Sequence, residues 1–250
     1  MKIQKIGARG AVFSFYHDYI GDTTNVYVIQ GSKHIFLCDT FLGPIPMNKV
    51  LNYLQRSDLL SKPIVVFNSH SHWDHHWGNC SFQSSLILSH EQCRENIATE
   101  EAKTLLKLKE HQQGRVEIIP PNAVFAKRIL FPEEQVEFFH TPGHTADSAS
   151  CLDQRDRVLF AADNIERPFP YLYEADLNCY IKTLEGYLTS EIKAYIPGHG
   201  EICFDKTMIQ ENLEYLRSFK SQTVKVTSLT KAQLRRHFAN LETLGIKAKN

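Results

Sequence analysis

Four side chains of the kind that bind metal ions lie within six consecutive positions of this sequence. The segment HSHWDHHWG, residues 70–78, reads as HxHxDH and supplies His70, His72, Asp74 and His75. Imidazole nitrogens and carboxylate oxygens form a ligand set that suits zinc. Because one tetrahedral ion does not easily accept four ligands from so short a loop, the spacing predicts two ions that share it. A solvated polar loop with an adventitious histidine cluster is the alternative at this point.

Three further candidate ligands follow short apolar runs later in the chain. Each run suits a buried strand, and each is stopped by Pro, Gly or Asn, the residues that make turns. The runs are IVVFNS before His70, VEFFHTPG before His144, RVLFAAD ending on Asp163, and AYIPG before His199. Strands that open onto one sheet edge would bring these side chains together, so the sequence predicts one composite site.

Taken in order, these motifs resemble those of the metallo-β-lactamase-fold hydrolase superfamily. The five matches are Asp39 in IFLCDT, HxHxDH at 70–75, His144 in TPGHT, Asp163 in FAAD and His199 in IPGHG. No later motif is specific alone, but their order and their placement after strands are. The resemblance implies an α/β fold, the αββα four-layer metallo-β-lactamase sandwich. We expect a single domain over residues 1–250, with the metals at one edge between its two sheets.

The resemblance also implies a role for each candidate residue. The seven candidate ligands divide into His70, His72 and His144 for one ion, Asp74, His75 and His199 for the other, and Asp163 as the bridge. Asp74 would also orient the nucleophile, as the catalytic residue. Asp39 is expected to support a ligand histidine, because a carboxylate fixes the tautomer of an imidazole; an Asp that caps a turn is the alternative. The implied cofactors are two divalent metal ions, zinc first, with iron and manganese as alternatives.

Such a centre predicts hydrolysis by a metal-bridging hydroxide, because two divalent ions lower the pKa of a shared water toward neutrality. No catalytic serine or cysteine is then needed. The resemblance implies a binuclear metal-dependent hydrolase of small esters, thioesters or lactones, a generic glyoxalase-II-like member of the superfamily. The alternatives are a mononuclear iron thiol or persulfide dioxygenase on the same fold, a phosphodiesterase, and a noncatalytic metal-binding module.

The residues around the bridging position narrow the subclass. β-Lactamases of this fold typically have Cys or Ser where this chain has Asp163, so antibiotic hydrolysis would be a promiscuous activity at best. The glutathione contacts of glyoxalase II have no clean match in NIERPFPYLYEAD, the segment that follows. Acyl-homoserine lactonases usually have a tyrosine shortly after the bridging Asp. Here Asn164 follows it, and Tyr171 or Tyr173 would have to substitute.

Composition favours an enzyme that acts on a small molecule. With 28 basic and 28 acidic side chains the chain has no strong field of either sign, so we expect neither nucleic acid nor a membrane as its main partner. The six cysteines form no CxxC pair and are expected to be buried reduced thiols. Arg9 and Gly10 interrupt the apolar character of the N-terminal segment. We therefore expect no signal peptide and a cytoplasmic location.

Two aromatic-rich segments are expected to border the site. FSFYHDY, residues 13–19, is expected as a loop, and IERPFPYLY, residues 165–173, follows Asp163 closely. Exposed rings beside a few polar groups are typical of a small-molecule pocket. The candidate substrate contacts are Phe15, Tyr16, Arg167 and Tyr171. For any one ring, packing in the core is an equal alternative. His76 is expected to have a structural or supporting role, because its neighbour faces the metals.

The coarse pattern of apolar residues predicts alternating strands and helices. Strands are expected near 11–15, 25–30, 34–39, 64–69, 84–89, 123–130, 135–140, 148–152, 157–162 and 194–198. Helices are expected near 46–57, 90–111, 176–189, 206–220 and 230–242.

Overall fold

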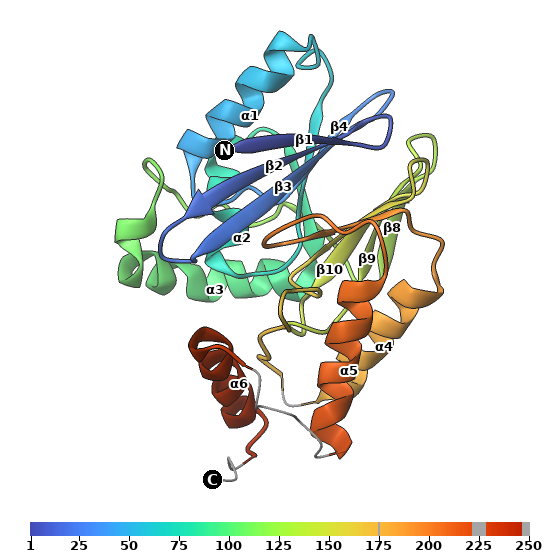
Figure 1. Cartoon of the computed structure of the whole chain (residues 1–250). Coiled ribbons are helices and arrows are strands. Elements are labelled where there is room, and N and C mark those ends of the chain that lie inside the picture. The colour runs from blue at the N-terminus through green and yellow to red at the C-terminus, as the bar shows by residue number, and fades with distance from the viewer. Residues whose placement is uncertain (175, 222–228, 247–250) are drawn as a thin grey trace.

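The fold is that of a computed structural model, which describes residues 1–174, 176–221 and 229–246. Figure 1 shows two sheets lying together, with α1 (Pro44–Arg56) on one side and α4 (Leu177–Thr189) and α5 (Thr207–Ser221) on the other. The last helix, α6 (Lys231–Thr243), lies below the sheets, on the side of α5. Within these described ranges, no helix has the length and apolar character needed to cross a membrane.

The first sheet contains the N-terminal half of the chain. In order across the sheet its strands are β1 (Lys2–Ile6), β2 (Gly10–His17), β3 (Asp22–Gln30), β4 (Ile35–Cys38), β5 (Ile64–Asn68), β6 (Leu86–His90) and β7 (Ala123–Phe125). Neighbours from β1 to β4 are antiparallel, and from β4 to β7 they are parallel. Parallel neighbours require crossover connections. The helix α1 connects β4 to β5, and α3 (Glu91–Lys107) connects β6 to β7.

The second sheet contains most of the C-terminal half. In order across the sheet its strands are β12 (Ala194–Pro197), β11 (Val158–Ala162), β10 (Ala149–Asp153), β9 (Val136–His140) and β8 (Arg128–Phe131). The strands β8 to β11 are antiparallel, and only β11 and β12 among these are parallel, with α4 between them in the chain. The carboxyl ends of β11 and β12 therefore lie at the same edge of the sheet.

Strand residues alternate between two buried faces. On β3, Tyr27 and Ile29 pack between the two sheets, whereas Val26 and Val28 pack toward α1, where Val50 and Leu54 are buried. Because successive side chains point to opposite faces of a strand, both faces of β3 are apolar. The outer face of β11 packs in the same way against α4 and α5. The result is the α/β, αββα four-layer sandwich, which confirms the predicted fold class.

Two predicted elements differ from the structure, and one strand was not predicted. The segment 13–19 is not a loop: β2 continues to His17, because its residues pair with β3 through Asp22. The predicted strand 123–130 is two strands, β7 and β8, which belong to different sheets. The strand β1 was not predicted, because its polar, mostly exposed sequence KIQKI has little apolar signal.

Candidate metal centre

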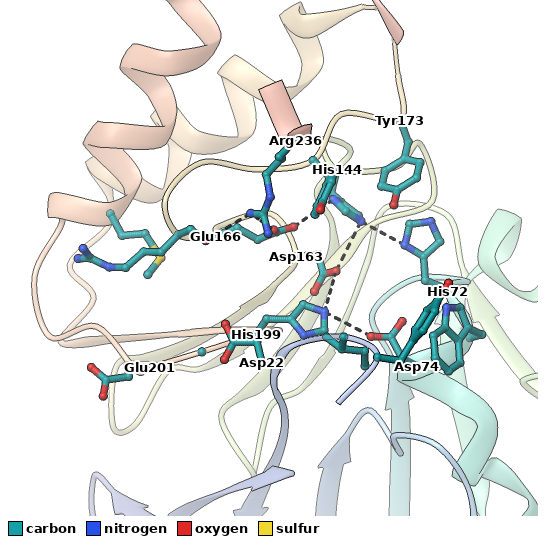
Figure 2. Close-up of a pocket in the computed structure, with 17 residues that line it drawn as sticks. Asp22, His72, Asp74, His144, Asp163, Glu166, Tyr173, His199, Glu201 and Arg236 are labelled. Carbon is teal, nitrogen blue, oxygen red and sulfur yellow. Dashed lines mark hydrogen bonds and ion pairs between the residues drawn. The ribbon is translucent and has the colours of Figure 1, made fainter. Parts of the chain in front are cut away.

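The candidate ligands come from both sheets and meet at one edge. The loop after β5 provides His70 and His72, and the short helix α2 (Trp73–His76) provides Asp74 and His75. The second sheet provides the other three, at strand ends: His144 after β9, Asp163 after β11 and His199 after β12. Figure 2 shows five of them, His72, Asp74, His144, Asp163 and His199, converging on one space. Neither sheet alone contains the cluster.

The seven side chains form two adjacent groups. In the first group the candidate ligand atoms of His70, His72, His144 and Asp163 lie within 4.8 Å of one another. In the second group those of Asp74, His75 and His199 satisfy the same limit. The Nε2 atom of His144 lies 3.2 Å from Nδ1 of His72, which identifies the nitrogens that face the first group's centre.

Asp163 lies between the two groups. Its Oδ1 is 3.3 Å from Nε2 of His75, and its Oδ2 is 3.4 Å from Nε2 of His199. The same Oδ2 is 3.5 Å from Nε2 of His144 and 3.8 Å from Nε2 of His70. One carboxylate therefore reaches histidines of both groups.

Several buried polar atoms at this centre have no hydrogen bond to any described residue. They are Nε2 of His70, Nε2 of His75 and Oδ1 of Asp163. Burying such atoms unpaired is costly, and native proteins rarely leave them so. All three atoms face the shared space and are good ligands for divalent cations. The donor set therefore fits one cation in each group, with Asp163 able to contact both.

Burial and neighbouring charge shift the pKa of the histidines in different directions. Burial lowers the pKa of His70 well below its usual value and that of His144 to about 3, so both imidazoles are neutral, the form that binds metals. Burial also acts to lower the pKa of His199 and His75, but the Asp163 and Asp74 carboxylates together outweigh it. The pKa of His199 is about 9, and that of His75 is also raised. Without a cation, Asp163 takes protonated imidazoles as its partners.

Asp39 is in contact with the ligand loop from outside the centre. Its Oδ2 accepts a hydrogen bond from Nδ1 of His75 at 2.7 Å. Its Oδ1 accepts from the Ser69 backbone at 2.8 Å, and the Ser69 hydroxyl lies 3.0 Å from Nδ1 of His70. Asp39 has a φ of 61°, in the left-handed region, which Asp tolerates better than most residues. The carboxylate thus supports one histidine directly and another through Ser69.

The strand β3 holds the third supporting contact, which the sequence motifs did not reveal. The Thr24 hydroxyl lies 3.3 Å from Nδ1 of His199. The neighbouring Asn25 donates to the backbone carbonyls of Pro197 and Gly200, each at 2.9 Å, and so holds both sides of the His199 loop. These residues are far from His199 in sequence and carry no motif, so only the fold brings them together.

His76 faces away from the centre. It is buried, belongs to neither ligand group, and its Nε2 lies 3.3 Å from Oε2 of Glu101 on α3. The same Glu101 oxygen accepts a hydrogen bond from the Trp77 indole at 3.0 Å. These two contacts connect the ligand loop to α3. Glu101 was not identified as a partner from the sequence.

Gly198 allows a close approach between two strand ends. A Cβ atom added at this position would overlap Oδ1 of Asp163, and it would lie 3.1 Å from Cε1 of His75. A side chain here would therefore displace the central carboxylate. The glycine of the IPGHG motif is needed for space beside Asp163 as well as for the turn.

A cavity of about 550 Å³ opens over the centre. Its lining includes candidate ligands and side chains from several other parts of the chain: Tyr19, Ile20, Asp22, Trp73, Glu166, Arg167, Tyr171, Tyr173, Glu201, Met208 and Arg236. Two of the four predicted substrate contacts, Arg167 and Tyr171, are among them. Tyr173 also lines the cavity, with its ring 4.6 Å from that of His72.

The other two predicted substrate contacts, Phe15 and Tyr16, do not line this cavity. Phe15 is 4% exposed and stacks on Phe41 in the core, with ring centroids 5.3 Å apart. Tyr16 is exposed on β2 but does not line the cavity. Both belong to a strand that continues past the predicted loop, so the turn places Tyr19 and Ile20 at the cavity instead.

Glu166 and Arg236 form a largely buried ion pair in the cavity wall. Arg236 donates from Nη1 to Oε2 of Glu166 at 2.8 Å. Burial and then Asp163 raise the pKa of Glu166 to about 7, against the opposing effect of Arg236. Figure 2 shows the Arg236 guanidinium between α6 and the centre. No sequence motif indicated that the last helix reaches the site.

Comparison with known proteins agrees with this geometry. The family model described as "Metallo-beta-lactamase superfamily" matches residues 19–199. The acyl-coenzyme A thioesterase MBLAC2 of Homo sapiens is 23% identical over 210 residues, which cover 72% of this chain and 74% of the relative. The protein of the same name from Gallus gallus is 25% identical over 168 residues, which cover 57% of this chain and 58% of the relative.

Solved structures show the same fold at lower identity. A metallo-beta-lactamase from Pontibacter korlensis superposes with a TM-score of 0.68 at 18% identity, covering 86% of this chain and 98% of that one. The DIM-1 metallo-beta-lactamase has a TM-score of 0.66 at 16% identity, covering 87% of this chain and 97% of its own. The family match extends over more than half of the chain, and its motifs form the cluster described above. This chain therefore belongs to the metallo-beta-lactamase superfamily.

Proposed function

We propose that this protein is a hydrolase that cleaves small thioesters with two divalent metal ions held by the seven clustered side chains. The observation that carries the proposal is the placement of Asp163, whose two oxygens face histidines of both groups. That arrangement suits a bridging ligand better than a mononuclear site. Among esters, thioesters and lactones we place thioesters first, because the acyl-coenzyme A thioesterase relatives match over most of this chain.

The bound ions would supply an activated water and a positive charge beside the substrate carbonyl. Asp74 lies where it can orient that water, because it lines the cavity and its Oδ2 is 3.3 Å from Nε2 of His199. An ionised carboxylate accepts hydrogen bonds only, so Asp74 would hold the water by its proton and direct its oxygen toward the carbonyl carbon.

In the reaction, a bond forms between the water oxygen and the carbonyl carbon, and the carbon–sulfur bond breaks. One proton of the water stays on the acid product, and the other passes to the thiolate, directly or through solvent. The products are a carboxylic acid and a thiol. Tyr173 is a neutral donor close to the candidate ligands: Figure 2 shows its hydroxyl directed toward His72 and His144. Burial and then Glu166 raise the pKa of Tyr173 above its usual value, so the phenol keeps its proton and can donate to a substrate oxygen.

The size and lining of the cavity favour a small substrate. A volume of about 550 Å³ is within the usual range for small-molecule sites. The rings of Tyr19 and Trp73 lie on one side with centroids 6.1 Å apart, and Tyr171 lies in the segment after Asp163. Aromatic walls of this kind suit an apolar acyl or leaving group.

The test is a substrate panel with protein reconstituted separately with zinc, manganese or iron. Acyl-coenzyme A and other acyl thioesters, homoserine lactones and a phosphodiester would be compared, with thiol release and metal content measured on the same samples. We expect thioester cleavage with two ions per chain and a loss of at least about 100-fold in Asp74→Asn. Oxygen consumption with a thiol at one iron per chain, or no turnover above that of buffer containing the metal, would overturn the proposal.

A further inference from the structure

The Nδ1 atoms of three ligand histidines have nearby side-chain oxygens outside the centre. These contacts join His70 to Ser69, His75 to Asp39 and His199 to Thr24 at 2.7–3.3 Å. His144 differs, because its buried Nδ1 has no hydrogen bond to any residue in the described part of the chain. Oε1 of Glu166 lies 3.7 Å from it, slightly beyond hydrogen-bond range.

Glu166 is held firmly in place on the loop after β11. It is 4% exposed, and its backbone is fixed on both sides by Asn212 of α5. The Asn212 side chain accepts from the Glu166 N–H at 2.9 Å and donates to the Glu166 carbonyl at 2.7 Å. Because the backbone is held on both sides, the carboxylate has little freedom to move away from His144.

Arg236 determines which carboxylate oxygen faces His144. It donates to Oε2 of Glu166 and to the Phe169 carbonyl, at 2.8 and 2.7 Å, and its guanidinium lies 4.0 Å from the Tyr171 ring centre. A buried carboxylate is strongly destabilised without such a partner. With Oε2 engaged, Oε1 is the oxygen directed at the histidine.

The helix α6 is bonded to the same loop at further points. Asn240 donates to the Pro170 carbonyl and accepts from the Leu172 N–H, both at 2.9 Å. The Thr243 hydroxyl donates to the Leu172 carbonyl at 3.0 Å. The position of Arg236 relative to Glu166 is therefore set by several contacts between the helix and the loop.

We propose that Glu166 is a positioning residue for His144 and that Arg236 of α6 holds it in that role. The inference rests on the proposed metal site. Nε2 of His144 faces the centre of its ligand group, and Nδ1 is the nitrogen that faces Oε1 of Glu166. The carboxylate then fixes the tautomer with the proton on Nδ1, which leaves the Nε2 lone pair for the metal. Outer contacts of this kind typically change metal affinity about 10- to 100-fold.

The experiment measures zinc affinity by competition with a chromophoric chelator, without any substrate. We expect Glu166→Ala to weaken one of two bound ions about 10- to 100-fold, while Glu166→Gln, whose amide oxygen still accepts, keeps most of the affinity. Arg236→Met should fall between them. Arg235→Met is the matched control, because Arg235 is the preceding, exposed residue of the same helix, and it should bind both ions as the parent does.

A second measurement separates positioning from general loss of structure. In zinc-loaded protein labelled with ¹⁵N-histidine, the His144 Nδ1–H signal should be protected from exchange with solvent. That protection should be lost in Glu166→Ala and kept in Glu166→Gln. Equal affinity for both ions in Glu166→Ala, with the protected signal unchanged, would overturn the proposal. Because the titration uses metal alone, its result does not depend on which bond the enzyme cuts.

Discussion

Asp39 and His75 form a fully buried hydrogen bond of 2.7 Å between Oδ2 and Nδ1. The bond directs Nε2 of His75 toward Asp163 and sets its tautomer. Both oxygens of Asp39 are in use, because Oδ1 accepts from the Ser69 backbone and Oδ2 also accepts from the Ser69 hydroxyl. Asp39 therefore accepts hydrogen bonds from three donors, and this requires that both of its side-chain oxygens be acceptors.

Asp39→Asn is expected to weaken metal binding about 10- to 100-fold with little change in the backbone. Asn tolerates the left-handed conformation, but it replaces one acceptor with an NH₂ group that must face a donor. Zinc affinity by chelator competition measures the effect, and circular dichroism checks the fold. Parent-like affinity would mean that His75 does not need this carboxylate.

Metal uptake at pH 7 is expected to release about two protons from the histidines of the second group. The pKa values of His199, about 9, and of His75 are raised above 6.5 in the metal-free protein, so both imidazoles are protonated at pH 7. The contribution of His199 to metal-free stability is complete below pH 6.5 and is lost as the pH rises through about 9, and the contribution of His75 is likewise lost only above its usual titration range. Metal affinity should therefore increase with pH over this interval.

Isothermal titration calorimetry in buffers of different ionisation enthalpy measures the released protons. His199→Asn is the matched control and should release about one proton fewer than the parent. Proton release that is equal in the two proteins would contradict the protonated state assigned to His199.

Glu134→Gln is expected to flatten the acid side of the stability curve. Burial acts to raise the pKa of Glu134, but hydrogen bonds from the Lys33 and Ser32 backbones outweigh it and lower the pKa to about 2. The ionised Glu134 therefore contributes to the free energy of unfolding above about pH 4.5, and this contribution is lost as the pH falls toward 2. Near neutrality we expect Gln to reduce the free energy of unfolding by about 1.5–3 kcal/mol.

Urea unfolding of the metal-free proteins between pH 2 and 7 measures this difference. The parent and the Glu134→Gln variant are compared with chelator present, so that titration of the metal-centre residues affects both proteins equally. The gap between parent and Glu134→Gln should narrow steadily below pH 4.5, and a constant gap would show that the charge of Glu134 contributes nothing.

Phe15→Ala is expected to reduce stability without changing KM, whereas Tyr171→Ala is expected to raise KM. Phe15 is buried against Phe41, so truncation should cost about 3–5 kcal/mol of stability and leave KM unchanged. Tyr171 lines the cavity, so truncation should raise KM about three- to tenfold, equivalent to ~1 kcal/mol, with metal content unchanged. Thermal melting and thioester kinetics on both variants check this, and a KM change in Phe15→Ala alone would reverse the assignment.

The clustering of the candidate ligands could be predicted because the relevant signals are local, whereas the fold class was predicted from the resemblance of the motifs to those of the superfamily. His144, Asp163 and His199 each follow an apolar run that ends in a turn, and such runs become neighbouring strand ends. The extent of β2 could not be predicted in this way, since FSFYH has the aromatic composition of a strand or of a binding loop. Pairing with β3 decides between them.

The supporting contacts were not predictable because they join residues far apart in sequence. Thr24 and His199 are separated by 175 positions, and Glu166 and Arg236 by 70. A threonine in a strand and an arginine in an amphipathic helix are common features without a metal-site signature. Their roles depend on which elements the fold brings together, and no local pattern encodes that.

The missing side chain at Gly198 links two positions that are 35 residues apart, because Oδ1 of Asp163 occupies the volume a Cβ would need. The effects of substitutions at 163 and 198 are therefore not independent. A side chain at 198 requires the Asp163 carboxylate to move and would also lie against the His75 ring, whereas a smaller residue at 163 would relieve the first overlap. Substitutions at these two positions are thus coupled, and a change at 198 is better tolerated once the central carboxylate has been lost.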